Sequence, residues 1–327
     1  MQALVFSGFD HTAVRDWPEP SAGQGEVILR VSAAGLCGTD RHIADGSYTA
    51  RSPVVLGHEV AGIVIATGTG VKRLQIGDRV SVDPNLSCGA CAYCHSGRPH
   101  LCEQLASFGV TRDGGLAPYM AVPESQCHRI PDGLATEAAI LAEPLSCVVH
   151  ALDRVHVWSG MTAAVWGLGT AGIMMIQCLR ALGVTSITGV SHRAEHREKA
   201  LRVGATAVLA TDSASGLFVD LAVEASGSLS AFESALGSLR KGGELLVYGV
   251  ANPEDAASVH PQRLFRDEIS IVSSFVGPYT MDRALHLLAA GTVDPSAVLG
   301  DAVTLREAAD WVVKSGPSRN AKVYTVF

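Results

Sequence analysis

The sequence has no excess of positive charge and few aromatic residues. Its 327 residues include 25 basic and 32 acidic side chains, a net charge of −7, without a long run of either sign. Because nucleic acids are bound mainly through clustered Lys and Arg, a nucleic-acid partner is not expected. Aromatic residues make up 6% of the chain while glycine is abundant at 34 residues. This composition favours tight βα turns and an α/β architecture over an all-β sandwich or a coiled coil.

The chain also lacks the pattern of a secretory signal, since residues 1–6 show no charged segment leading into a long apolar one. The longest stretch without Asp, Glu, Lys or Arg covers residues 155–179, which is long enough to cross a bilayer. Four glycines interrupt it and divide it into a β-like run and an apolar helix. We therefore expect a buried βα unit, no membrane partner and a cytoplasmic protein.

Two patterns of hydrophobicity divide the chain, whose length is sufficient for two domains. Residues 1–127 contain short β-type runs between Gly and Pro, which is typical of a mainly-β domain. Residues 136–271 repeat strand, glycine turn and helix, which predicts a doubly wound parallel sheet. The predicted strands of this sheet are 163–166, 186–190, 219–223 and 244–248. An apolar helix at 284–288 and a final strand at 321–326, returning to the first domain, are also expected.

A glycine-rich turn follows the first strand of this sheet and opens an apolar helix. It reads Gly167-Leu168-Gly169-Thr170-Ala171-Gly172. Here the first glycine permits the turn, the second admits the pyrophosphate and the third lets the helix pack on the strand. The helix N-terminus also favours the phosphate charge. The sequence therefore predicts a dinucleotide site.

The second strand predicts which nicotinamide coenzyme binds. It ends in Ser191-His192-Arg193, with Arg197 a turn later, where an NAD site usually has a carboxylate for the ribose hydroxyls. A guanidinium instead binds a 2′-phosphate through charge-assisted hydrogen bonds. NADP is thus preferred. Alternatively, Arg193 and Arg197 are solvated charges, and NAD binds without a carboxylate partner.

Four cysteines gather in one glycine-containing loop. Cys88, Cys91, Cys94 and Cys102 have spacings of two, two and seven residues. Four thiolates this close repel one another unless a cation neutralises them, so they predict a structural zinc site. A disulfide pair is one alternative. The Cys-x-x-Cys-His pattern of covalent haem attachment is another, but it requires export and leaves two thiols unexplained.

Three separate segments carry further side chains of the types that bind zinc. Residues 35–42 read Gly-Leu-Cys-Gly-Thr-Asp-Arg-His, residues 57–59 read Gly-His-Glu, and residues 142–145 read Ala-Glu-Pro-Leu. In these motifs, and over essentially its whole length, the chain resembles the medium-chain zinc-dependent alcohol dehydrogenase family, in its polyol (sorbitol-like) dehydrogenase branch.

The resemblance implies that Cys37 and His58 are ligands of a catalytic zinc. Glu59 and Glu143 would complete the site, either directly or through water. Which of the two binds stays open, because neighbouring residues such as His58 and Glu59 rarely both face one metal unless the backbone turns there. An open coordination position must remain for substrate.

The resemblance also implies a mechanism, in which the metal polarises a substrate hydroxyl and hydride passes to the nicotinamide. Thr39 would take up the proton and His42 would release it to solvent. Val250 and Phe275 belong to segments that would line the nicotinamide.

The fold implied by the resemblance is α/β with two domains. A GroES-like mainly-β catalytic domain would cover residues 1–147 and 278–327, with the structural-zinc loop at 88–102. A Rossmann coenzyme domain would cover residues 148–277. We further expect a homodimer or homotetramer.

The sequence departs from the family pattern at two places. Between residues 212 and 219 only a short link stands where relatives carry an additional helix. Val276-Gly277 replaces the Arg-Tyr of the sorbitol enzymes, whose guanidinium contacts the polyol, so a less hydroxylated secondary alcohol or a cyclitol becomes a candidate substrate.

The expected activity is reversible interconversion of a secondary alcohol or polyol and its ketone with NADP. Two alternatives stay open: a threonine-type amino-alcohol dehydrogenase and a non-catalytic nucleotide-binding relative. The second is disfavoured because fold stability does not require the candidate site residues together.

Overall fold

The computed structural model describes residues 1–9, 11–314 and 321–327. Its contacts divide the chain into two compact units, which are described separately. The first unit comprises Met1–Ser146, Pro278–Gly291 and Leu299–Phe327. The second unit comprises Cys147–Gly277 and Thr292–Val298.

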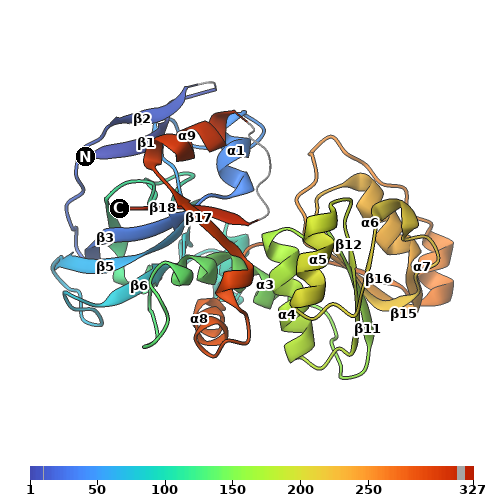
Figure 1. Ribbon diagram of the computed structural model, residues 1–327. Coiled ribbons are helices and arrows are strands. Elements are labelled where there is room, and N and C mark those ends of the chain that lie inside the picture. The colour runs from blue at the N-terminus through green and yellow to red at the C-terminus, as the bar shows by residue number, and fades with distance from the viewer. Residues whose placement is uncertain (10, 315–320) are drawn as a thin grey trace. The chain divides into compact units, whose positions relative to one another are not determined.

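The first unit is built on a seven-stranded, mostly antiparallel sheet (Figure 1). In sheet order its strands are β10 (Cys127–Arg129), β6 (Arg79–Val82), β5 (Glu59–Thr67), β3 (Glu26–Gly35), β18 (Lys322–Val326) and β17 (Leu299–Val303), with β9 (Tyr119–Pro123) also paired to β3. Two smaller sheets contain β2 (Thr12–Asp16), β1 (Gln2–Phe6) and β4 (Val54–Val55), and β7 (Asn85–Leu86) with β8 (Ala106–Ser107). The prediction of a mainly-β first part is confirmed.

Branched aliphatic side chains fill the core of this unit, because they fit the crowded inner face of a pleated sheet. Val31, Val60, Val64 and Val80 are fully buried there. The helices of the unit, α3 only in part, are α1 (Gly38–Ala44), α2 (Ala92–His95), α3 (Ala142–Asp153), α8 (Met281–Ala289) and α9 (Leu305–Val313). The predicted C-terminal strand is confirmed as β18, which runs antiparallel to β3 and so returns to the first unit.

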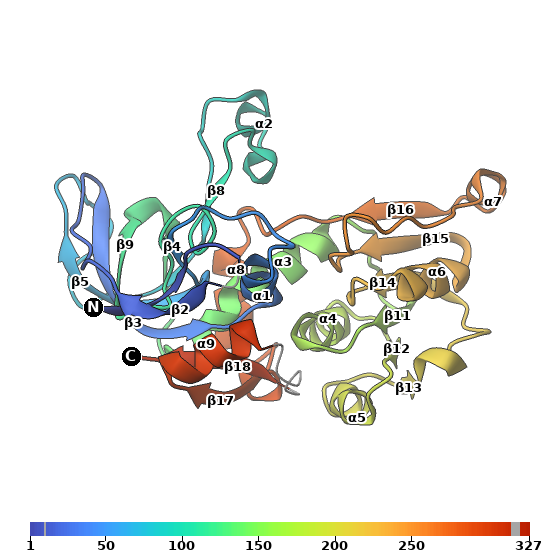
Figure 2. The same ribbon diagram turned by 90° about the horizontal axis from the view of Figure 1, so that it is seen from above.

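The second unit is a six-stranded sheet in which every pairing is parallel. In sheet order its strands are β13 (Ala207–Leu209), β12 (Ser186–Val190), β11 (Thr162–Trp166), β14 (Val219–Glu224), β15 (Leu239–Val247) and β16 (Ser270–Ser273). Its other helices are α4 (Thr170–Ala181), α5 (Ala194–Arg202), α6 (Leu229–Gly237) and α7 (Pro261–Asp267). Figure 2 shows α4 and α5 on one face of this sheet and α6 on the other, as a doubly wound sheet requires.

All four strands predicted for this sheet are present, as β11, β12, β14 and β15. The apolar stretch at 155–179 forms β11 and the twelve-residue helix α4, as expected of a buried βα unit. Within the described parts of the chain, no helix is long and apolar enough to cross a membrane. The link before β14 contains a single 3-10 turn, Thr211–Ser213, and no α-helix lies between residues 212 and 219, as the sequence indicated.

Candidate metal centre and coenzyme site

The first metal-ligating segment is held by the start of helix α1. Cys37 occupies the N-cap, and its backbone N–H donates to Asp40 Oδ2 at 2.9 Å. This contact closes the first turn of the helix and fixes the direction of the cysteine side chain. The sulfur of Cys37 lies 3.8 Å from Thr39 Oγ1.

His58 and Glu59 converge on this cysteine. One ligand atom from each of Cys37, His58 and Glu59 lies within 4.8 Å of the other two. Gly57, at φ +93°, turns the chain immediately before His58, and a Cβ at this position would approach Leu116 N to 2.8 Å. A glycine is therefore needed at this turn. The backbone turn brings two neighbouring residues to one site, the arrangement that the sequence alone left open.

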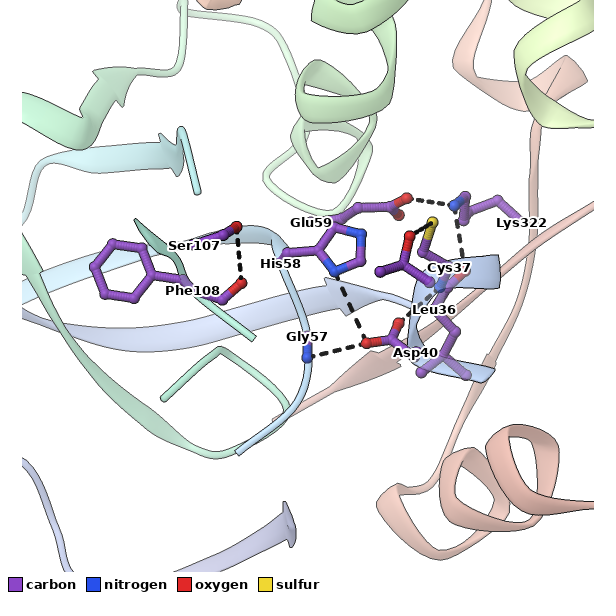
Figure 3. Close-up of polar contacts among 10 residues, drawn as sticks. Leu36, Cys37, Asp40, Gly57, His58, Glu59, Ser107, Phe108 and Lys322 are labelled. Carbon is purple, nitrogen blue, oxygen red and sulfur yellow. Dashed lines mark hydrogen bonds and ion pairs between the residues drawn. The ribbon is translucent and has the colours of Figure 1, made fainter. Parts of the chain in front are cut away.

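A buried lysine binds the Glu59 carboxylate (Figure 3). Lys322 Nζ donates to Glu59 Oε1 at 2.5 Å and to Leu36 O at 3.2 Å. Burial by itself lowers the pKa of Lys322, but Glu59 and Cys37 outweigh it and raise that pKa. The other carboxylate oxygen, Oε2, is buried and has no hydrogen-bond partner among the residues described.

This donor set fits a zinc ion. A thiol, an imidazole and a carboxylate oxygen are all zinc ligands, and three protein ligands leave a position open for substrate. An unsatisfied buried carboxylate oxygen is costly, and a cation between it, the Cys37 sulfur and the His58 ring would satisfy it. Glu59 can thus face Lys322 with one oxygen and the metal with the other.

Asp40 supports the imidazole from the opposite side (Figure 3). Its Oδ1 lies 3.8 Å from His58 Nδ1 and accepts the backbone N–H of Gly57 at 3.3 Å. Burial raises the pKa of Asp40, whereas for His58 the charges of Cys37 and Asp40 outweigh burial and raise the pKa well above its usual value. At 3.8 Å this is an ion-pair contact and not a hydrogen bond, so Asp40 places negative charge behind the ring without fixing its tautomer.

Glu143 lies in the first turn of α3 and is 8% exposed. Among the residues described, it is outside the set of ligand atoms that lie within 4.8 Å of one another. Burial, opposed by His58 and assisted by Glu59, raises the pKa of Glu143 to about 7. Its carboxyl group therefore exchanges a proton near neutral pH in the metal-free protein.

His42 lies on α1 with 55% of its side chain exposed. Its Nδ1 is 2.9 Å from Ser47 Oγ. The exposed part of this ring is open to water.

The four cysteines of the loop around α2 form a second cluster. Their sulfur atoms all lie within 4.8 Å of one another. Backbone N–H groups point at them: Cys91 N donates to Cys88 Sγ and Gln104 N to Cys102 Sγ, both at 3.3 Å. The N–H of Cys94 is the main cause that lowers the pKa of Cys91 to about 6, whereas burial raises the pKa of Cys94 to about 11. Converging thiols with amide donors behind them fit a structural zinc site.

The glycine-rich turn has the backbone that a dinucleotide site needs. Gly167 has φ +92°, and a Cβ there would lie 2.8 Å from Ser226 N in the loop after β14. Gly169 is the N-cap of α4, so Thr170 and Ala171 begin the helix. Leu168 is buried with 2% exposure and thus presents only its backbone to a ligand. Gly172 is buried in α4.

The residues after β12 form a basic cluster. Arg197 donates from Nη1 to Ser191 O at 2.7 Å, and the N–H of Arg193 donates to Ser191 Oγ at 3.2 Å. The Arg193 Nε lies 3.3 Å from His192 Nε2. The structure thus brings together the four residues that the sequence singled out for the 2′-phosphate.

Val250 and Phe275 are both exposed, at 81% and 50%. Val276, next to Phe275, adopts φ +47°. This left-handed conformation is costly for a β-branched residue and is typical of functional loops.

Two residues of the metal centre were missed in the sequence. Asp40 lies in the same motif as Cys37. The apolar residues Ile43 and Ala44 follow it on the same helix, and this was the signal that Asp40 could be buried. Lys322 is the one charged residue of the apolar strand Lys322–Val326. Nothing in the local sequence shows that its partner lies 263 residues earlier.

A dinucleotide-binding parallel sheet, a β domain with a Cys/His/Glu cluster and a four-thiol loop together define a zinc-dependent dehydrogenase. Comparisons with known proteins agree. Residues 23–132 match the alcohol dehydrogenase GroES-like domain, and residues 171–290 match the zinc-binding dehydrogenase domain.

Several relatives match nearly the whole chain. The chain is 34% identical over 289 residues to D-arabinitol dehydrogenase 1 of Uromyces fabae, covering 84% of this chain and 82% of that protein. It is 31% identical to sorbitol dehydrogenase of Bacillus subtilis, covering 95% and 92%. A solved zinc-binding dehydrogenase of Sinorhizobium meliloti bound to NADP superposes with a TM-score of 0.97 at 30% identity, covering 100% and 99%.

The chain therefore belongs to the medium-chain zinc-dependent alcohol dehydrogenase family, in its polyol dehydrogenase branch. It is an oxidoreductase with a GroES-like domain and a Rossmann domain, and its family uses zinc and a nicotinamide coenzyme.

Proposed function

We propose that the protein interconverts a secondary alcohol or polyol and the corresponding ketone, with Cys37, His58 and Glu59 holding the catalytic zinc. The observation that carries this proposal is the convergence of these three side chains around a buried carboxylate oxygen that has no partner in the described chain. Glu143, buried close enough for its charge to act on His58, would contact the metal through water or exchange ligands with Glu59.

When bound, the zinc would supply positive charge that makes the substrate hydroxyl more acidic. Side chains of the protein then transfer the proton of the substrate hydroxyl to solvent. Thr39 Oγ1, beside the Cys37 sulfur, would accept the hydroxyl proton while its own hydroxyl proton passes on toward His42. His42, half exposed on the same helix, would release a proton to water. Asp40 places its carboxylate 3.8 Å behind the His58 ring, where its negative charge would stabilise positive charge on that ring.

For the coenzyme we propose NADP, with NAD as the alternative. The backbone of Gly167, Gly169 and Gly172 and the start of α4 would receive the pyrophosphate. Arg193, Arg197, His192 and Ser191 would hold the 2′-phosphate. Similar solved structures occur with both coenzymes: the S. meliloti protein holds NADP, and an Escherichia coli alcohol dehydrogenase at 26% identity holds NADH.

The substrate proposed is a polyol, cyclitol or simple secondary alcohol. Named relatives act on arabinitol and sorbitol, which supports a polyol. Val276 cannot supply the charged contact that an arginine would make, which favours a substrate with fewer hydroxyl groups. Val250 and Phe275 would line the nicotinamide ring.

The domain roles are part of the same proposal. Residues 1–147 and 278–327 would form the catalytic domain, with a structural zinc at 88–102, and residues 148–277 would form the coenzyme domain. A cytoplasmic location is supported by the eight cysteines, all of them described and none in a disulfide.

We also propose a homodimer or homotetramer. Strand β16 is at the edge of the parallel sheet, and Ile271 on it is 38% exposed. Phe265 on the preceding helix is 87% exposed. Open edges with exposed apolar side chains favour pairing with a second copy of the chain.

A turnover assay tests the function. Purified protein would be given polyols, cyclitols, secondary alcohols and threonine with NAD or NADP, before and after a chelator, beside a Cys37→Ser variant. Chelator-sensitive turnover that Cys37→Ser abolishes while coenzyme binding persists supports the proposal. Turnover of threonine alone favours the amino-alcohol dehydrogenase, and coenzyme binding without any turnover favours a non-catalytic protein.

A further inference from the structure

Helix α1 cannot hold its own position. It has seven residues, whereas isolated helices shorter than about 12–15 residues are marginal in water. It nevertheless carries Thr39 and His42, the two residues of the proposed proton path. The contacts that hold α1 in place therefore also set the positions of Thr39 and His42.

A pair of side chains joins α1 to the C-terminal helix α9. The guanidinium carbon of Arg41 lies 3.6 Å from the ring centroid of Trp311, and Arg41 Nε donates to the Trp311 carbonyl at 3.1 Å. Both residues are half-buried. The two helices are in contact and lie side by side in both views (Figures 1 and 2). One arginine thus contacts the ring and the backbone of the same tryptophan, which fixes distance and orientation together.

Helix α9 is held in place by its N-terminal cap and by its packing. A capping box closes its first turn, with Thr304 N donating to Glu307 Oε2 at 2.8 Å and Glu307 N donating to Thr304 Oγ1 at 3.2 Å. Ala308 and Val312 are buried in the core of the first unit. Trp311 itself packs against this core and is half-buried, so it offers α1 a fixed surface.

Three consecutive residues of α1 make three different contacts. Arg41 reaches α9, His42 reaches Ser47 and Ile43 is fully buried in the core. Successive residues of a helix point about 100° apart, so these contacts fix the rotation of α1 about its axis. Loss of one of them would let Thr39 and His42 turn relative to the Cys37 sulfur.

We propose that Arg41 and Trp311 are a positioning pair, through which the C-terminal helix keeps the Thr39–His42 proton path aligned with the metal centre. The inference rests on the proposed function and adds two residues to it. Neither residue touches substrate in this scheme, since both act through the orientation of α1.

The indole nitrogen allows a selective test. Trp311 Nε1 is buried and makes no hydrogen bond to any described residue, so the contribution of Trp311 comes from its ring face and its backbone carbonyl. Trp311→Phe keeps an aromatic face, whereas Trp311→Leu removes it. Lys314→Ala is the matched control, because it removes only an exposed ion pair with Asp310 at the end of the same helix.

The experiment compares wild type, Trp311→Leu, Trp311→Phe, Arg41→Gln, Lys314→Ala and Thr39→Val after zinc content has been equalised. It measures kcat, KM, the solvent deuterium isotope effect and the effect of deuterium on the carbinol carbon. We expect kcat to fall about tenfold in Trp311→Leu and Arg41→Gln with KM within about twofold, since a misaligned proton path loses part of general acid–base catalysis. Trp311→Phe and Lys314→Ala should stay within about twofold of wild type.

The isotope effects distinguish positioning from folding. A slowed proton path raises the solvent isotope effect and lowers the carbinol isotope effect, as in Thr39→Val. A smaller fraction of folded enzyme lowers kcat and leaves both isotope effects unchanged, which would overturn the inference. Wild-type kinetics in Trp311→Leu would overturn it too. Should Trp311→Leu fail to fold, Arg41→Gln decides, because it leaves the core of α9 intact.

Failure of the proposed function has a different signature. In that case wild type itself shows no chelator-sensitive turnover with any alcohol. If wild type is active and the Arg41 and Trp311 variants have wild-type kcat and isotope effects, only the positioning pair is refuted.

Discussion

Lys322 Nζ lies 2.5 Å from Glu59 Oε1, and both side chains are buried, with 7% and 0% of their surfaces exposed. The pair joins the last strand of the chain to the residue that follows His58. It also orients the second oxygen of Glu59 within the Cys37 and His58 cluster. The C-terminus is therefore part of the metal centre, and its removal is expected to affect metal binding as well as folding.

Lys322→Met should destabilise the metal-free protein by about 3–5 kcal/mol, because it leaves a buried carboxylate without its cation. Zinc would restore part of the loss, since the metal also compensates that charge. Urea unfolding of both forms measures the two values. Lys314→Met, which breaks an exposed pair, should cost no more than about 0.5 kcal/mol. Equal costs for the two variants would contradict the role given to Lys322.

Cys91→Ser should remove the metal of the four-thiol loop and leave that of the other cluster. Metal analysis is expected to fall from two zinc ions per chain, one for each cluster, to one. Turnover should persist while the thermal midpoint falls, because a structural zinc contributes to folding. Cys178→Ala, a buried thiol on α4 outside both clusters, should keep both ions. Loss of both ions from Cys91→Ser would contradict independent sites.

Arg197→Gln should weaken NADP selectively. Losing a charge-assisted hydrogen bond to a phosphate is expected to raise KM for NADP about tenfold or more, with KM for NAD within about twofold. Steady-state kinetics with both coenzymes measures the ratio. Arg202→Gln, an exposed residue at the end of the same helix, is the control. A parallel change for both coenzymes would show that Arg197 supports the fold rather than the 2′-phosphate.

Glu143 should make the stability of the metal-free protein depend on pH. Burial raises its folded pKa to about 7, above the usual 4.5 of a glutamate, so the folded state holds the proton more tightly. Its stabilising contribution is complete below about pH 4.5 and is lost as the pH rises through about 7. Unfolding free energies from pH 5 to 8 should therefore fall less in Glu143→Gln than in wild type. Glu137→Gln, at an exposed site, should follow wild type.

Several elements of the fold could be predicted because their signals are local. The four strands of the parallel sheet are continuous apolar runs, and the turn at Gly167 lies between a strand and a helix, which is enough to define a dinucleotide-binding unit. The sequence analysis missed β13 and β16. Both are short strands at the edges of the sheet, where fewer side chains are buried and the apolar run that marks a strand is weaker.

The residue types of the two metal clusters and the coenzyme site can be recognised in the chain before it folds. They are four cysteines within fifteen positions, a cysteine, a histidine and two glutamates in three motifs, and basic residues where an acid is usual. Such spacing dictates chemistry, because close thiolates need a cation and a guanidinium suits a phosphate.

Which of these residues come into contact depends on the folded chain. The turn at Gly57 brings Glu59 to the cysteine, burial fixes Asp40 behind His58, and the antiparallel pairing of β18 with β3 delivers Lys322 to Glu59. It also placed Trp311 against Arg41, 270 residues apart. These contacts join distant segments. Their physical cause is the burial of a shared core and the pairing of β18 with β3, which no local pattern encodes.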